Sequence, residues 1–131
     1  MMLGGVRSPM QASIELAAEL AFWGRLGIGM WAVRNLAGQF IGTTGIHDRP
    51  DGRGLALRFA FDPASRGKGL AREAASVALW HAHDTGRFAR IIGVAREDNL
   101  ASRSVLGGIG MRHVETFQRG RDAVMVYESR R

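Results

Sequence analysis

The chain has 131 residues, of which 46% are hydrophobic and 23% are charged. This balance is typical of a globular protein, and the length predicts one domain over residues 1–131 with a core of ordinary size. The sequence contains no cysteine, which excludes disulfide frameworks, thiolate metal sites and a cysteine nucleophile. It also lacks the run of about 18 apolar residues that a membrane-spanning helix would need.

We expect a cytoplasmic protein, because the N-terminus lacks the charged start and apolar block of a secretory signal. The formal net charge of +6 is compatible with an anionic ligand or with nucleic acid. However, Lys68 is the only lysine, and the arginines are scattered from Arg7 to Arg131 without a dense block. A nucleic-acid partner is therefore disfavoured. No pair of histidines or carboxylates has the spacing of metal ligands, so we expect no metal.

The first predicted element is a helix that begins near Ser8, where Pro9 suits the first helical position and Gln11 completes a capping box. Apolar side chains then recur at helical spacing up to a stop at Gly24, namely Ile14, Ala17, Ala18 and Ala21. A second apolar row on the same helix is formed by Leu16, Leu20 and Trp23. This row is expected to pack either in the centre of the monomer or against a second subunit.

After the first helix the pattern changes to that of strands. Residues 30–33 and 39–46 are predicted to be strands joined by a turn at residues 35–38. Residues 48–54 form a second turn cluster. Residues 55–61 make a third strand, which is apolar on both faces except at Arg58, so we expect it inside the sheet.

A glycine-rich loop at residues 66–69 connects the third strand to a helix over residues 69–84. Glycines let backbone N–H groups turn toward one point, and the first N–H groups of a helix have no partner within it. The macrodipole adds partial positive charge, so this loop is suited to a phosphate or pyrophosphate. Three cationic side chains surround it, those of Arg66, Lys68 and Arg72. The alternative is a glycine-rich turn whose cations only face solvent.

Two common phosphate-binding loops do not fit this segment. A nucleoside-triphosphate loop requires Lys-Ser/Thr after its second glycine, whereas Leu70 follows Gly69. The dinucleotide fingerprint requires a third glycine at the position of Arg72. The pattern that remains is Arg66-Gly67-Lys68-Gly69-Leu70-Ala71.

The second half of the chain continues with a short apolar strand at residues 90–94. A strand–helix–strand unit of this size favours parallel pairing by a right-handed crossover. Residues 96–106 are predicted to be a loop and a short helix capped by Asn99, and residues 111–117 and 122–128 a closing hairpin. The fold class is therefore predicted to be α+β, with a mixed, largely antiparallel sheet flanked by helices.

The pattern at residues 66–71 resembles the acyl-CoA pyrophosphate loop of the GNAT acetyltransferases, which that family writes as Arg/Gln-x-x-Gly-x-Gly/Ala. Within this superfamily the chain is similar to the branch of ribosomal-protein N-terminal acetyltransferases. Motifs of that branch are matched in order over residues 25–118. They are Trp31 to Val33, Gly38 to Gly42, Glu73-Ala74, and the set Asn99, Ser102, Val105, Leu106, Gly110 and Met111.

The resemblance implies that acetyl-CoA is the co-substrate and that acetyl moves to a primary amine, either a protein N-terminus or a small amine. Direct attack in a ternary complex is expected, because no cysteine can carry an acyl intermediate. The resemblance also implies a wedge for the cofactor between the strands at 55–61 and 90–94. The residues it assigns to cofactor binding are Phe59, Ala60, Phe61, Arg66, Gly67, Lys68, Gly69, Leu70, Ala71, Arg72 and Asn99.

Two side chains are candidates for catalysis. The resemblance places Ser102 near the sulfur as a proton donor, although a serine in a first helical turn also bonds local backbone groups. The glutamate base that is frequent in the branch aligns with Ala56, close to Arg58. His47 is then the remaining candidate base, since its ordinary pKa suits the role, and its alternative is a surface histidine at a turn.

The front of the chain departs from the family pattern, which begins with a strand and a helix that carry part of the acceptor site. Only a helix is predicted before Trp31, so the first strand is expected to be missing. The acceptor site would then be incomplete, completed in a homodimer through the N-terminal helix, or truncated by a misassigned start. This departure and Ala56 favour an alternative function, a catalytically inactive CoA-binding module.

Overall fold

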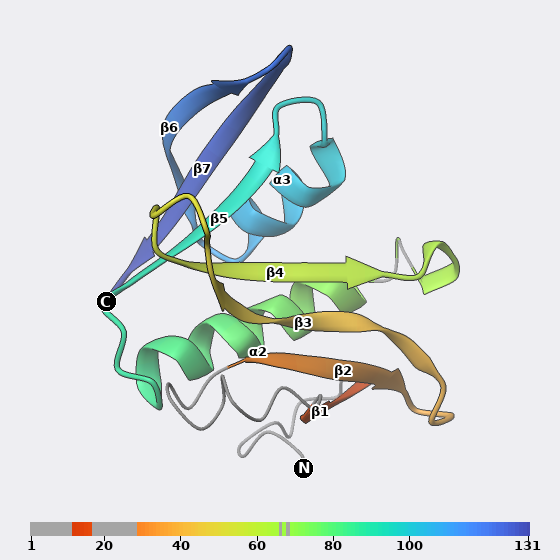
Figure 1. Cartoon of the computed structure of the whole chain (residues 1–131). Helices are drawn as coiled ribbons and strands as arrows, with labels where there is room; N and C mark the ends of the chain where they lie inside the picture. The colour runs from red at the N-terminus through yellow and green to blue at the C-terminus, as the bar shows by residue number, and fades with distance from the viewer. Residues whose placement is uncertain (1–11, 17–28, 66, 68) are drawn as a thin grey trace.

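The computed structural model of the chain describes residues 12–16, 29–65, 67 and 69–131. Within them, seven strands form one sheet in the order β1-β2-β3-β4-β5-β7-β6 (Figure 1). In chain order the elements are β1 (Ala12–Leu16), β2 (Met30–Asn35), β3 (Phe40–Asp48), β4 (Leu55–Phe61), η1 (Pro63–Ser65), α2 (Leu70–Asp84), β5 (Arg90–Arg96), α3 (Leu100–Gly108), β6 (Arg112–Arg119) and β7 (Asp122–Arg130).

The beginning of the chain corrects the sequence prediction. Residues 12–16 form strand β1 instead of part of a helix, and β1 pairs antiparallel with β2 from Ala12 opposite Asn35 to Leu16 opposite Trp31. The first strand that we expected to be missing is therefore present. The helical spacing led to a wrong prediction because residues 12–16 also alternate between apolar and polar, which suits a strand equally well. Pairing with the edge of β2 then favours the strand.

The predicted N-terminal helix otherwise falls on residues outside the described part of the chain. Leu20 and Trp23, which carried the predicted subunit contact, lie there as well. The homodimer and the single domain over residues 1–131 thus stay predictions.

The three strands of the predicted meander are confirmed, with β4 at the residues expected for it. The side chains of β4 point alternately to the two faces of the sheet, as expected for a strand. Leu55, Leu57, Phe59 and Phe61 belong to the main hydrophobic core, whereas Ala56 belongs to a small second cluster on the other face of the sheet. The side chain of Arg58 is exposed and shares the face of Ala56.

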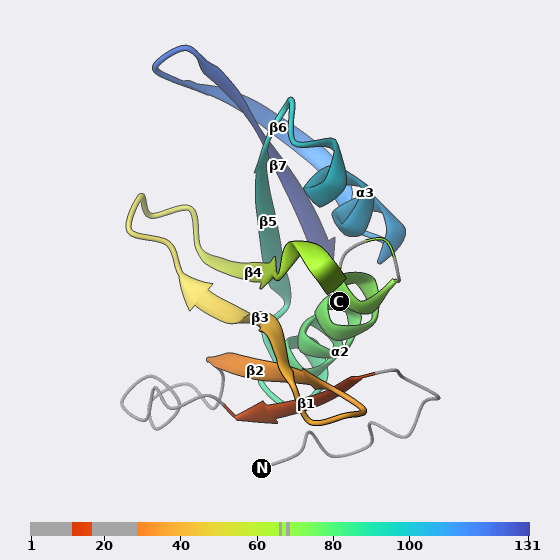
Figure 2. The same ribbon diagram turned by 90° about the vertical axis from the view of Figure 1, so that its right-hand side faces the viewer.

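Helices α2 and α3 both lie on one side of the sheet (Figure 2). α2 presents Leu70, Ala74, Ala75 and Ala78 to the sheet as buried residues. α3 reaches β5 through Leu106, which is 1% exposed. A Cβ atom on Gly93 of β5 would lie 2.5 Å from Leu106 Cδ2, so the glycine is what lets α3 pack this closely.

The sheet divides between β4 and β5. These strands are parallel, as predicted, but pair only at Ala56 with Ile92 and at Leu57 with Gly93. β4 stays paired with β3 as far as Phe61 opposite Gly42, while β5 stays paired with β7 over its whole length. The two halves of the sheet consequently run in different directions beyond Leu57 (Figure 1).

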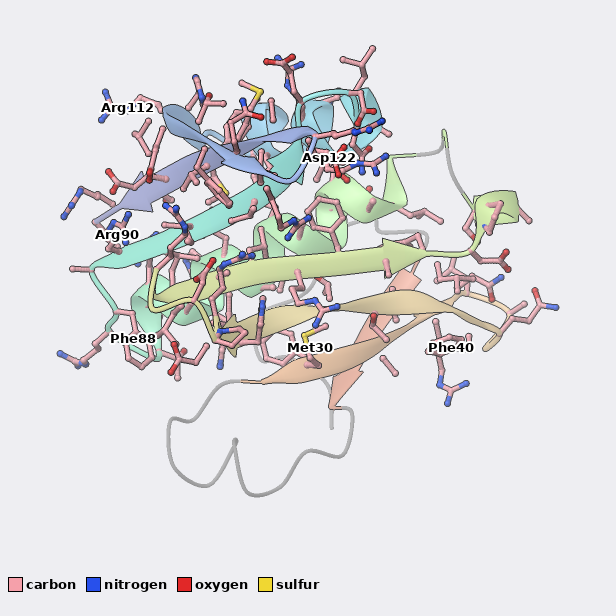
Figure 3. The ribbon with its side chains drawn as sticks, turned by 45° about the horizontal axis from the view of Figure 1, so that its top comes forward. Met30, Phe40, Phe88, Arg90, Arg112 and Asp122 are labelled. Atoms are coloured by element: carbon pink, nitrogen blue, oxygen red, sulfur yellow. The ribbon has the colours of Figure 1, made fainter. Side chains whose placement is uncertain are left out.

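The sheet face opposite the helices, called here the open face, carries the small cluster of Ala56, Ile92 and Val126, with Val94 and Phe117 packed against it. Figure 3 views the molecule with this face forward and labels Met30 and Arg90, which lie on the two halves of the sheet. Ion pairs border the small cluster: Arg53 with Glu115 at 2.7 Å, and Arg90 with Glu128 at 2.6 Å.

We predict that Gly93→Ala destabilises the protein by about 1–3 kcal/mol, because the new methyl group overlaps buried Leu106. Gly107→Ala is the matched control, since a Cβ there meets nothing within 4 Å. Urea denaturation measures the free energy of unfolding of both variants, and the control should be as stable as the wild type or slightly more stable. The account of α3 packing is wrong if Gly93→Ala is as stable as the wild type.

Candidate functional site

Two adjoining cavities lie where β4 and β5 separate. The larger, of about 290 Å³, is lined by Phe59, Ala60, Phe61, Ala71, Asn99, Ala101, Ser102 and Val105. The smaller, of about 130 Å³, is lined by Leu57, Arg58, Phe59, Val94, Ser102 and Leu106. Phe59 and Ser102 border both, so the cavities follow β4 on one side and α3 on the other. Neither is lined by an acidic side chain of the described residues.

The edge of β4 supplies backbone donors to this space. Asp62 donates its N–H to Ile41 O of β3 at 2.9 Å, which fixes the alternation of hydrogen bonds along the β3–β4 pair. By this alternation the amides of Phe59 and Phe61 face away from β3, toward the cavities. The amide of Ala60 faces β3, so Ala60 lines the cavity without offering its N–H. Among the described strands, none pairs with β4 at Phe59 or Phe61 on this side.

The N-terminus of α2 supplies a second set of donors. The first hydrogen bond of the helix joins Glu73 N–H to Gly69 O at 3.0 Å. The amides of Leu70, Ala71 and Arg72 precede it and have no acceptor inside the helix. Gly69 has a φ of 76° and makes no side-chain cap, so no side chain of its own covers these amides.

The loop before α2 is also open to a ligand. Gly67 has a φ of 80°, and a Cβ on either Gly67 or Gly69 would meet nothing within 4 Å. Backbone with positive φ and no neighbour can turn its amides toward an anion. Arg66 and Lys68, which we assigned to the same anion, lie outside the described residues.

The side chain of Arg72, which we assigned to the cofactor, packs against α3. A Cβ on Gly108 would lie 2.7 Å from Arg72 Nε, so the guanidinium rests against the C-terminal end of α3. A cation there interacts favourably with the partial negative charge of the helix end. Arg72 thus connects the first turn of α2 to the end of α3, and it is absent from the lining of both cavities.

Asn99 and Ser102 are brought to the cavity together. Asn99 caps α3 as predicted, accepting the N–H of Ser102 at 3.1 Å through its Oδ1. The same two residues line the larger cavity. The cap fixes the first turn of α3, and this positions the Ser102 hydroxyl where the two cavities meet.

His47 lies on β3, opposite Ala56, and shares the open face with it. Its Nδ1 is 3.1 Å from Ala56 O, which can only accept, so Nδ1 carries the proton and Nε2 keeps a lone pair in the neutral ring. Burial is the main cause that lowers the pKa of His47 below its ordinary 6.5, and the charge of Arg58 adds to it. His47 lines neither cavity; it stands one strand away from the parting of the sheet.

Two further histidines, His81 and His83, lie in the second half of α2 and make contacts within the fold. His83 contacts Phe88 O at 2.7 Å through Nδ1 and Ser129 Oγ at 2.8 Å through Nε2, which ties the end of α2 to β7. The ring of His81 lies edge-on to Trp31 at a centroid distance of 5.0 Å. Both positions are far along α2 from its N-terminal amides.

Sequence reasoning missed part of the lining. Ala101 and Val105 face the larger cavity, and Val94 and Leu106 the smaller one. A signal was present, because residues 101, 102, 105 and 106 share one helical face once Asn99 is taken as the cap. No group of three or more His, Asp or Glu side chains in the described part could hold a metal ion. No described helix is long and apolar enough to cross a membrane.

Comparison with known proteins gives one family. Residues 2–112 match the family model described as an acetyltransferase (GNAT) domain. A curated relative, the FsC-acetyl coenzyme A-N(2)-transacetylase of Aspergillus fumigatus, is 39% identical over 59 residues. That alignment covers 45% of this chain and only 25% of the relative.

Solved structures with the same fold include an acetyltransferase from Agrobacterium tumefaciens, with a TM-score of 0.82 at 18% identity, covering 100% of this chain and 95% of that one. The ribosomal-protein-S5-alanine acetyltransferase of Vibrio fischeri has a TM-score of 0.73 at 16% identity, covering 86% and 67%. An acetyltransferase from Salmonella typhimurium, solved with its cofactor acetyl-CoA, has a TM-score of 0.70 at 17% identity, covering 85% and 69%. The Vibrio protein fits the branch that the sequence motifs indicate.

We predict that Gly69→Val weakens CoA binding about tenfold or more, because a branched side chain strains the positive φ and covers amides that would bind a charged group. Gly52→Val is the matched control: Gly52 also has a φ of +76° and open space, but lies in the β3–β4 turn. Isothermal titration calorimetry with CoA compares the two. Equal affinities for both variants would contradict the role of the α2 N-terminus.

Proposed function

Because the chain belongs to the GNAT acetyltransferase family, whose members transfer acetyl from acetyl-CoA, we propose that it acetylates a primary amine by direct attack in a ternary complex. The observation that carries this proposal is the parting of β4 from β5 beside the open N-terminus of α2. This region then offers a cavity for the extended pantetheine arm of CoA and, next to it, backbone amides for the diphosphate.

The described residues fit acetyl-CoA in three respects. The amides of Leu70, Ala71 and Arg72 lack helical acceptors and suit the diphosphate. The larger cavity, with Ala71 at one end and Ser102 at the other, suits the pantetheine arm. The smaller cavity, floored by Leu106, suits the thioester. The acyl group would thus lie near the last paired residues of β4 and β5.

The chemistry needs a polarised carbonyl, a neutral amine and a protonated leaving group. We assign the first task to the β4 edge, where the amide of Phe59 is a fixed donor toward developing oxyanion charge. The amine nitrogen forms a bond to the carbonyl carbon, and the carbon–sulfur bond then breaks. Ser102, which borders both cavities, is assigned to donate a proton to the departing thiolate.

His47 is assigned as the base that takes the proton from the amine. The hydrogen bond from Nδ1 to Ala56 O leaves Nε2 as the acceptor. Burial and Arg58 both lower the pKa of His47, as does Arg49, while the bond to Ala56 and the charge of Asp48 oppose them. The net lowering keeps the ring neutral at pH 7.

The first test is release of free CoA thiol from acetyl-CoA, followed with a panel of amines and peptide N-termini. Acetylated product with at least one amine class supports the proposal. Tight CoA binding without transfer to any amine would instead identify a catalytically inactive CoA-binding module, the alternative that Ala56 favours. Salt-dependent retention on nucleic acid without CoA binding would contradict both.

We predict that kcat/KM falls at low pH with a midpoint below 6.5, since protonation removes the lone pair of His47 and its pKa is lowered. kcat/KM therefore has its full value above this midpoint and decreases as the pH falls through it. His47→Gln should lower kcat about 10²-fold and remove this limb of the profile. If His47→Gln shows the same decrease of kcat/KM at low pH as the wild type, the titrating group is not His47.

We predict that Ser102→Ala lowers kcat about tenfold or more while leaving the affinity for CoA within a factor of about two. Ser104→Ala is the matched control, because Ser104 is an exposed residue of the same helix outside both cavities. Steady-state kinetics measure kcat, and calorimetry measures affinity. If both variants have the wild-type kcat, Ser102 is not the proton donor.

A further inference from the structure

Arg58 is an exposed arginine at the mouth of the smaller cavity. It follows Leu57, the last β4 residue that pairs with β5, and it lines that cavity together with Val94 and Ser102. Strand alternation places it on the open face with Ala56, since Leu57 and Phe59 pack into the main core on the other face. An acceptor that approaches the thioester from the open face therefore passes this side chain.

The surroundings of Arg58 leave its charge uncompensated. The residue directly opposite on β3 is Gly45, which has no side chain to offer, and the open-face neighbours along β4 are Ala56 and Ala60. In the described part of the chain, Arg58 makes no ion pair. The charge of Arg58 lowers the pKa of His47 on the same face, so the two groups repel when both are charged.

Two carboxylates whose side chains the structure describes on the open face, Glu115 and Glu128, are paired with other arginines. Glu115 accepts from Arg53 at 2.7 Å. Glu128 accepts from Arg90 at 2.6 Å and from Arg130 at 2.9 Å, and these hydrogen bonds lower its pKa, so it stays ionised and paired. Arg58 thus differs from Arg53, Arg90 and Arg130, which each contact a carboxylate in the described part of the chain.

An uncompensated guanidinium at this place has two effects on an incoming amine. It disfavours the ammonium form, which helps to supply the neutral nucleophile. It also disfavours acceptors that carry further positive charge, because like charges in a partly enclosed site repel. A carboxylate on the acceptor reverses the second effect, since the planar guanidinium binds carboxylates through two parallel N–H···O bonds.

We propose that Arg58 is a specificity-determining residue that binds a carboxylate of the acceptor, so that the substrate class is amines carrying a carboxylate close to the amino group. This inference rests on the proposed acetyl transfer and narrows its acceptor. The carboxylate can belong to a free amino acid or to an acidic residue at the start of a peptide.

The experiment compares matched acceptors that differ only in the carboxylate. β-Alanine is compared with β-alaninamide, and a peptide that begins Ser-Glu with the same peptide beginning Ser-Gln. For the wild type we expect kcat/KM to favour the carboxylate member of at least one pair about tenfold or more. The pair that shows the preference distinguishes the free amino acid from the peptide.

Arg58→Gln should abolish this preference, chiefly through a higher KM for the carboxylate acceptor, so that the two members of each acceptor pair have equal kcat/KM. Arg58→Lys should retain part of it, because an ammonium keeps the charge but loses the bidentate geometry. Arg119→Gln, which removes an exposed arginine of the β6–β7 hairpin, is the control for net charge and should keep the full preference.

Binding separates this inference from the proposed function. Calorimetry with CoA-saturated protein measures acceptor affinity without turnover, and carboxylate-dependent binding that is lost in Arg58→Gln supports Arg58 even if no amine is acetylated. Acetylation without any carboxylate preference, or a preference that Arg58→Gln leaves intact, would overturn the inference and leave acetyl transfer standing. Absence of the preference in both binding and turnover would overturn it as well.

Discussion

The structure depends on one interruption of backbone pairing: two strands that begin as parallel neighbours stop pairing after Leu57 and Gly93. Backbone N–H groups inside a protein need partners, so an unpaired strand edge in the middle of a sheet is costly unless a ligand or water satisfies it. The edge amides of Phe59 and Phe61 are in this position. In the proposed function, the polar, extended arm of CoA would compensate this cost.

The elements around the interruption hold it open. β7 pairs with β5 over its whole length and β3 with β4, so each half of the sheet stays rigid up to the gap. α3 is seated on β5 by Leu106 against Gly93, and its Asn99 cap brings Ser102 to the gap. α2 starts beyond the end of β4, and its first amides, which have no acceptor within the helix, add further donors. In the proposed function, β4 supplies polarisation, α2 binds the diphosphate and α3 donates the proton, with β5 between the two helices in the chain.

The sequence predicted the second part of the fold well, because local rules and tertiary packing agree there. Three segments there each favour a single local structure. They are the asparagine that caps α3, the glycine turn before α2 and the apolar strand at residues 55–61. Residues 12–16 were predicted wrongly, since their spacing suits a helix as well as a strand, and only the free edge of β2 decides between them. The direction of Arg72 was not predictable either, as it depends on where α3 ends.

The central claim is that the unpaired amides at the edge of β4 and at the start of α2 bind CoA. The most direct measurement is a titration of ¹⁵N-labelled protein with CoA, observed through the backbone amide resonances. We predict large shifts for Phe59, Phe61, Leu70 and Ala71, with the amide of Ala60 less affected because it stays bonded to β3. Shifts confined to other parts of the chain, or none at these four residues at saturating CoA, would contradict the account.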